Sequence, residues 1–228
     1  MNRFLIAFAA LLMAAPAFSQ NITGVENHDA KELAYMKNMY SKFSKWIPDG
    51  WYLDAVAEGD LDGDGIPDAA LVVTDVDIHH LEDISKPFES KLLVLLNQGN
   101  RYRVFIDDDE ATARGYGAKG LVVVGLGIAK QVLTLDQGPE YPSWSAQKLY
   151  RMENSRFRLI GSEYNNRFYD IDENFIEETT SINYLTGKCN IKKYNLSGKD
   201  PMKPVVVWKK LKNNRKVYFG ESTEGIEC

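Results

Sequence analysis

Residues 59–73 read GDLDGDGIPDAALVV, an acidic, glycine-rich loop followed directly by five apolar residues. Gly65, at position 6 of the loop, allows a sharp turn that a Cβ atom would oppose. The apolar residues are typical of a buried strand. The segment therefore predicts a tight loop that leads into a strand and gathers carboxylates around one point. These carboxylates occupy loop positions 1, 3, 5 and 9 and belong to Asp60, Asp62, Asp64 and Asp68.

Calcium is the ion that this spacing favours. It binds about six to eight oxygen atoms, and the position-7 carbonyl of Ile66 adds a main-chain oxygen to the four carboxylates. Without a cation the carboxylates would repel one another strongly. Magnesium fits less well, because it requires a stricter octahedral shell and keeps its waters. A solvated acidic turn that binds no ion is the remaining alternative.

The loop differs from an EF-hand at position 12. Leu71 stands there, where an EF-hand has a bidentate glutamate. The flanking segments, residues 53–58 and 69–73, are short and strand-like. The expected arrangement is therefore strand, calcium loop, strand.

The rest of the chain predicts a mainly β (α+β) fold with one N-terminal helix. The helix is expected at about residues 29–45, where apolar side chains recur at helical spacing and Asp29 with Glu32 matches a capping box. Short apolar segments separated by turn residues predict antiparallel sheets, arranged as a sandwich or a partial propeller. We expect strands at residues 69–74, 91–96, 101–106, 121–124, 131–135, 147–152 and 156–160, and a closing hairpin of residues 205–208 and 216–219.

The N-terminus has the pattern of a cleaved signal peptide. An apolar run at residues 4–14 follows Arg3, and Ala17-Phe18-Ser19 supplies small residues for cleavage before Gln20. No cysteine follows the run, so a lipid anchor is not indicated; a membrane anchor is the alternative, although the run is short for a bilayer. We expect a signal peptide at residues 1–19, a single domain at residues 20–228 with the loop at 60–68, a periplasmic or secreted location, and no transmembrane segment in the mature chain.

The chain has two cysteines, Cys189 and Cys228. In an oxidising compartment such a pair is typical of a disulfide, which here would tie the C-terminal tail to the body of the protein. Two free or metal-bound thiols are the alternative. Two cysteines without a nearby histidine cannot complete a four-ligand zinc site.

The segment at residues 59–73 resembles the calcium loop of FG-GAP/VCBS repeats, which form blades of β-propellers such as those in integrin heads. The resemblance implies the four aspartates as side-chain ligands and Ile66 as a carbonyl ligand. The family usually has asparagine where Asp62 stands, and an aspartate there adds charge.

The wider chain is similar to uncharacterised bacterial secreted proteins that carry a single loop of this type. The similarity covers about two-thirds of the mature chain and implies an extracytoplasmic bacterial protein, without an activity. The matching segments are residues 47–51 (IPDGW), 93–99 (LVLLNQG), 157–161 (FRLIG) and 181–188 (SINYLTGK).

Four weaker patterns favour ordinary structure over function. Residues 115–120 spell G-x-G-x-x-G but lack the preceding strand and following helix of a dinucleotide site. The adjacent His79 and His80 would point to opposite faces of a strand. The consecutive acids at residues 107–110 lack the spacing of a calcium loop. Trp144 is interpreted as a packing residue, with a sugar-stacking platform as the alternative.

The net charge of −5 and the absence of a long basic stripe argue against a nucleic-acid partner. The chain carries neither G-x-S-x-G nor H-E-x-x-H. Our first hypothesis is an exported calcium-binding protein of the cell envelope, non-enzymatic, with a protein or carbohydrate ligand. The alternatives are a calcium-supported hydrolase acting on a polysaccharide, and an inhibitor or adhesion module that recognises a protein through Trp144 or Tyr141.

Overall fold

The structure, a computed structural model, describes residues 30–77, 88–99, 101–108, 122–139, 144–197 and 203–228. The chain divides into two compact units, residues 1–44 and 45–228, which we describe separately. No helix in the described ranges is long and apolar enough to cross a membrane. Several sequence-based expectations lie outside the described residues: the signal peptide at 1–19, the cap at Asp29, His79, His80, the glycine-rich segment 115–120 and Tyr141.

The first unit contains the expected N-terminal helix. Helix α1 spans Ala30–Phe43, and its last turn carries Lys42, whose charge suits the negative end of the helix dipole. A short 3-10 turn, Ser44–Trp46, follows the helix. The prediction of one helix near the N-terminus is confirmed, with its C-terminal boundary two residues earlier than expected.

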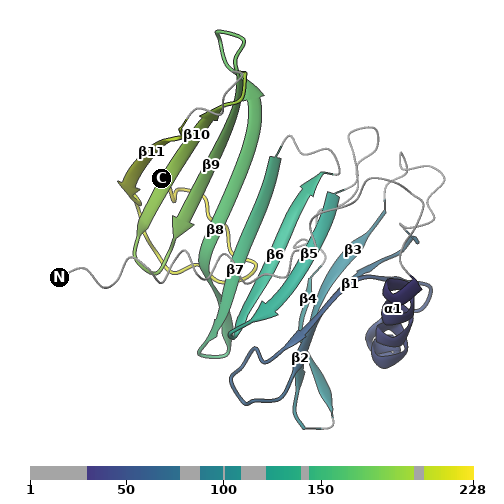
Figure 1. The fold of residues 1–228 in the computed structure, drawn as a ribbon. Coiled ribbons are helices and arrows are strands. Elements are labelled where there is room, and N and C mark those ends of the chain that lie inside the picture. The colour runs from purple at the N-terminus through teal and green to yellow at the C-terminus, as the bar shows by residue number, and fades with distance from the viewer. Residues whose placement is uncertain (1–29, 78–87, 100, 109–121, 140–143, 198–202) are drawn as a thin grey trace. The chain divides into compact units, whose positions relative to one another are not determined.

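The second unit begins with a four-stranded antiparallel sheet (Figure 1). Its strands, which are neighbours in sequence order, are β1 Tyr52–Gly59, β2 Asp68–Thr74, β3 Ser90–Asn97 and β4 Tyr102–Asp108. The two central strands have continuous apolar sequences because both of their faces are largely buried. The strands expected at residues 91–96 and 101–106 are confirmed as β3 and β4, which pair antiparallel.

A seven-stranded antiparallel sheet follows, in which each strand again pairs with its neighbours in sequence. In each sheet the first and last strands of the order do not pair with each other, so neither sheet is a closed barrel. Four strands is the size of a propeller blade, whereas seven is not. The strands are β5 Val122–Ala129, β6 Val132–Pro139, β7 Trp144–Glu153, β8 Arg156–Tyr169, β9 Phe175–Asn183, β10 Lys188–Asn195 and β11 Val205–Lys210.

The two sheets share one hydrophobic core. Val72 and Leu92 from the first sheet belong to the same buried cluster as Leu133 and Leu159 from the second. Strand β5 lies against β1 and β2, so the sheets meet where the first sheet begins. This junction places the acidic loop, which connects β1 and β2, beside the second sheet.

The C-terminal third differs from the expectation in two respects. Strands β9 and β10 were not predicted, because polar residues occupy both of their faces and conceal the alternation that marks a strand. The prediction that residues 205–208 and 216–219 form a closing hairpin is wrong. Residues 205–208 do form a strand, but it pairs with β10, whereas Val217 is buried and its carbonyl accepts the N–H of Leu159 on β8.

The predicted disulfide between Cys189 and Cys228 is confirmed. It links the buried side chain on β10 to the last residue of the chain, across a sequence separation of 39. Val217 and Ile226 from the tail join or border the core cluster. The covalent link therefore holds a packed tail against the second sheet.

Replacing both cysteines, as Cys189→Ala with Cys228→Ala, should lower the free energy of unfolding by about 3 to 4 kcal/mol, because the unfolded chain regains the freedom that the link removes. Urea unfolding followed by circular dichroism measures this loss. Adding a reducing agent should lower the midpoint of the wild-type protein and leave that of the double variant unchanged. Equal midpoints for wild type and double variant would contradict a stabilising role.

Candidate metal centre

The acidic loop joins the ends of two paired strands. Gly59, the last residue of β1, lies directly opposite Asp68, the first residue of β2. Asp60 follows β1 immediately. The pairing of the strands therefore holds the first and last predicted ligand positions close together.

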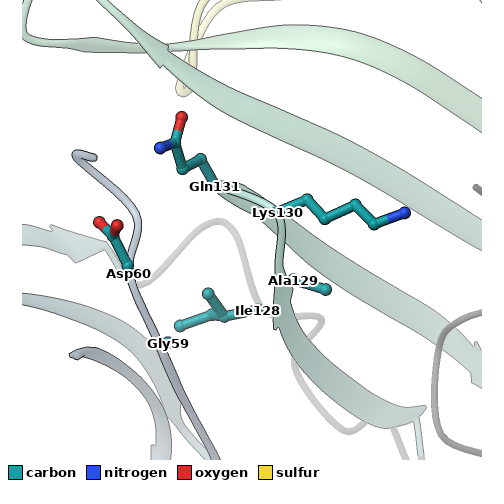
Figure 2. A pocket seen from close by; sticks show the side chains of 6 residues that line it. All are labelled: Gly59, Asp60, Ile128, Ala129, Lys130 and Gln131. Atoms are coloured by element: carbon teal, nitrogen blue, oxygen red, sulfur yellow. The ribbon is translucent and has the colours of Figure 1, made fainter. Parts of the chain in front are cut away.

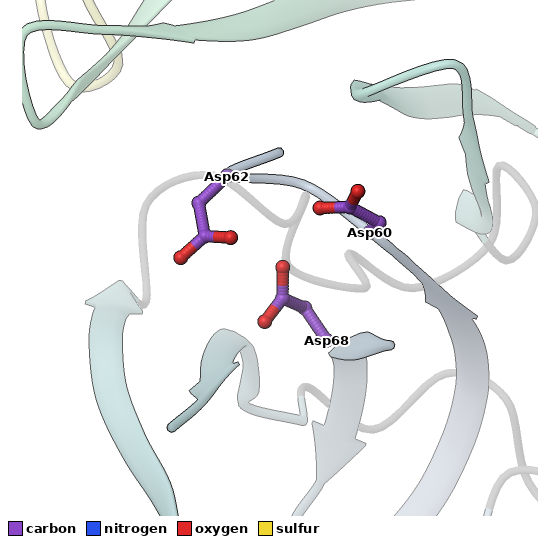
Figure 3. A group of neighbouring side chains, drawn as sticks. All are labelled: Asp60, Asp62 and Asp68. Carbon is purple, nitrogen blue, oxygen red and sulfur yellow. The ribbon is translucent and has the colours of Figure 1, made fainter. Parts of the chain in front are cut away.

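Three of the predicted ligands converge. Carboxylate oxygens of Asp60, Asp62 and Asp68 all lie within 4.8 Å of one another. Figure 3 shows the three carboxylates pointing toward a common space. Oxygens on a calcium shell of radius about 2.4 Å are at most about 4.8 Å apart, so this spacing fits one ion.

The structure does not bring the fourth carboxylate, Asp64, into this group. Its Oδ1 instead accepts the N–H of Ile66 at 2.7 Å and closes a local turn. The Asp64 side chain is exposed, and a rotation toward the group would break its hydrogen bond with Ile66. Asp64 and the Ile66 carbonyl therefore remain predicted ligands.

Backbone N–H groups shape the loop around its first aspartate. Asp60 accepts the N–H of Gly63 through Oδ1 at 2.6 Å and the N–H of Gly65 through Oδ2 at 3.1 Å. Both glycines have left-handed backbone conformations, with φ of 86° and 83°. A side chain at either position would strain this geometry, which explains the glycines between the aspartates.

Asp68 anchors the loop to the sheet. It is fully buried; its Oδ2 accepts the N–H of Leu61 at 2.7 Å, and its Oδ1 accepts the N–H of Asn97 at 2.8 Å. Burial raises the pKa of this carboxyl above its ordinary value, and the charge of Asp62 adds to the effect, whereas the two hydrogen bonds lower it. A cation among the carboxylates would favour the ionised form and oppose the cost of burial.

Sequence reasoning missed Asn97, at the end of β3, as part of the site. Besides its N–H to Asp68, its Nδ2 donates to the carbonyl of Pro67 at 3.1 Å. Its Oδ1 is buried and has no hydrogen-bond partner within the described part of the chain. A contact that spans about thirty residues leaves no local signal in the sequence.

The turn between β5 and β6 packs against the loop from the second sheet. A Cβ atom on Gly59 would lie 2.6 Å from Cγ2 of Ile128, and one on Gly63 would lie 3.0 Å from Nε2 of Gln131. Lys130 and Gln131 both have positive φ, 51° and 62°, which is the geometry of a tight hairpin turn. Neither contact was predicted, because each depends on how the two sheets meet.

A cavity of about 450 Å³ lies between this turn and the loop. Its lining includes Asp60, Ile128, Lys130 and Gln131. In Figure 2, Gln131 extends toward the side that carries Asp60, whereas Lys130 points away. The acidic loop is therefore accessible from this side.

Two weaker sequence patterns fall on strands. Trp144 begins β7, and its ring stacks on Tyr164 of β8 with centroids 6.4 Å apart. Asp107 and Asp108 end β4, and Asp107 forms an ion pair with Lys91 at 3.3 Å. The acidic run thus begins within a sheet, and its residues 109 and 110 lie outside the described residues.

Comparisons with known proteins add no relative. The chain matches no protein-family model, and neither the curated proteins nor the solved structures give a significant match. The resemblance to FG-GAP/VCBS loops therefore depends on the residues of the loop itself.

The contact between Gly59 and Ile128 gives a test of the junction. Gly59→Ala should lower the free energy of unfolding by about 1 to 3 kcal/mol, because the new methyl group meets Cγ2 and the backbone carbonyl of Ile128. Chemical unfolding of Gly59→Ala, Ile128→Ala and the double variant forms a mutant cycle. We expect Gly59→Ala to lower the free energy of unfolding less in the Ile128→Ala variant than in the wild type. Strict additivity would contradict direct contact.

Asp54 gives the first sheet a pH dependence. It lies at an irregularity in the pairing of β1 with β2, and burial raises its pKa to about 7. The folded protein then holds a proton that the unfolded chain releases above about pH 4. Stability from this group is therefore complete below about pH 4 and falls as the pH rises toward 7.

Asp54→Asn should flatten the decrease in unfolding free energy between about pH 4 and pH 7, because asparagine does not titrate. Denaturant unfolding at intervals across this range measures the slope. The matched control is Asp172→Asn, an exposed aspartate after β8, which should keep the wild-type slope. The assignment fails if Asp54→Asn and wild type have the same slope.

Proposed function

We propose that the loop at residues 60–68 binds one calcium ion and that the chain is an exported, calcium-stabilised, non-enzymatic binding or structural protein of the cell envelope. The observation that carries the proposal is the convergence of three carboxylates from Asp60, Asp62 and Asp68. An ion there would receive further oxygens from Asp64, the Ile66 carbonyl and water, toward the six to eight that calcium takes.

Electrostatics supports a bound cation. Two carboxylates at this spacing repel by about 3 to 4 kcal/mol at an effective dielectric constant of about 20. Backbone N–H groups offset part of this repulsion at Asp60 and Asp68. Among the described residues, Asp62 accepts only the N–H of Asp64, at 3.2 Å. A divalent ion would convert the repulsion into attraction.

The place of the loop in the fold supports a structural role. The loop connects β1 to β2, contacts β3 through Asn97 and contacts the second sheet through Gln131. An ion that fixes the loop therefore stabilises the junction of the two sheets. The disulfide supports an oxidising compartment, where calcium reaches levels that suit weak sites.

The hydrolase alternative requires two convergent carboxylates in a cleft. The cavity beside the loop has one carboxylate in its lining, Asp60, and a second cavity near β11 also has one, Asp170. Neither cavity favours hydrolysis. Within the described residues, these two cavities give the hydrolase alternative no support.

Calcium should raise the melting temperature of metal-free protein. At a hundredfold excess over Kd, an ion that binds only the folded state stabilises by about 2.7 kcal/mol, or about 5 to 10 °C for a chain of this size. Asp60→Asn and Asp62→Asn should each weaken binding about tenfold or more, because each removes charge from the ion. Isothermal titration calorimetry and thermal melts measure both effects.

Asp172→Asn serves as the matched control for these variants as well, since it removes one exposed aspartate outside the loop. It should bind calcium as the wild type does. Calcium uptake absent at millimolar concentration in the wild type would contradict the proposal. An equal loss in the control would assign the effect to net charge and not to the loop.

A further inference from the structure

Strand β11 is one edge of the seven-stranded sheet. It pairs with β10 on one side, and no strand of the described residues pairs with its other side (Figure 1). Alternate N–H and C=O groups of an edge strand point outward and provide a template for another strand. The edge of β11 is six residues long, a common length for a complete strand.

Four consecutive apolar residues on this edge are exposed. Val205, Val206, Val207 and Trp208 expose 65%, 42%, 45% and 66% of their surface. Neighbouring side chains on a strand point to opposite faces, so both faces of the strand are apolar and exposed. Protein edges of this kind are usually shortened, covered or interrupted by charge. An exposed apolar edge is therefore a candidate interaction surface.

The surroundings of this edge are basic. Lys209 and Lys210 end the strand, Lys188 pairs with Lys210 across the sheet, and Lys192 pairs with Val206. Among the described residues none of these four lysines forms an ion pair, in contrast to Lys193, whose ammonium group contacts Glu178. The ammonium groups of these four lysines lie on β10 and β11 and provide charge for an acidic partner.

A cavity of about 270 Å³ adjoins the start of β11. Phe168, Ile176 and Val205 give it apolar walls, and Lys203 also lines it. Asp170 is part of the same lining. Val205 belongs both to the exposed edge and to this lining, so the cavity lies at the end of β11 opposite Lys209 and Lys210.

We propose that the free edge of β11 binds an extended, acidic polypeptide segment of another protein as an added antiparallel strand. Outward N–H and C=O groups supply the main-chain hydrogen bonds, the apolar side chains cover the added strand, and the lysines select acidic residues. A second copy of β11 carries no acidic residue on the strand, so it lacks the charge that the lysines select. The surface is separate from the calcium loop and does not depend on it.

The probe is a synthetic nine-residue peptide in which glutamate alternates with valine. Hydrogen exchange should show at least tenfold slower exchange for outward-facing amides of β11 when the peptide is bound. The affinity of the protein for the peptide, measured by calorimetry, should fall severalfold between 50 and 300 mM NaCl, because salt screens exposed charges. Peptide binding without protection of β11 would overturn the proposal, as would no binding at millimolar peptide.

Charge reversal separates recognition from misfolding. Lys209→Glu with Lys210→Glu should weaken the glutamate peptide at least tenfold and should create binding of a matching lysine-valine peptide. The same two reversals at Lys37 and Lys216, outside β10 and β11, should leave the glutamate peptide bound. Failure to gain the lysine peptide would contradict the proposal. Protection of β11 that increases with protein concentration alone would assign the edge to a second copy.

Discussion

The pairing of Gly59 with Asp68 is the constraint on which the site depends. It closes the loop between β1 and β2 and places a fully buried carboxylate at its base. That carboxylate accepts N–H groups from Leu61 within the loop and from Asn97 at the end of β3. One side chain therefore fixes the loop to the sheet before any ion is considered. Burying and crowding negative charge has a cost that the proposed cation would offset.

The loop also contacts the junction between the two sheets. Leu61, between two predicted ligands, is buried in the core cluster that both sheets share. Gly59 and Gly63 approach Ile128 and Gln131 of the second sheet so closely that side chains would not fit. The alternation of apolar, acidic and glycine residues in the loop thus gives packing contacts on one side and three convergent carboxylates on the other. A metal-dependent change in the loop would act directly on this junction.

Local patterns predicted the parts of the fold that local physics determines. The apolar runs at β2 and β3 and the helical spacing at α1 predicted elements that the structure confirms. Strands β9 and β10 were not predicted, because their sequences are polar and they are held in the sheet by pairing with neighbouring strands on both sides.

The candidate site also has a part that local sequence patterns predicted and a part that they did not. Aspartate spacing identified three convergent carboxylates, whereas Asn97 and Gln131 reach the loop through contacts that no nearby residue encodes. Aspartate spacing did not predict the position of Asp64, because the prediction placed all four carboxylates around one ion. In the structure Asp64 accepts a hydrogen bond from Ile66 in its own loop.

A crystal structure of the protein grown with calcium, with anomalous diffraction to identify the ion, tests the central claim most directly. The account predicts one peak among Asp60, Asp62 and Asp68, with Asp64 turned toward it and the Ile66 carbonyl among oxygens at about 2.3 to 2.6 Å. Clear density for the loop with only water between the aspartates, at millimolar calcium, would contradict it.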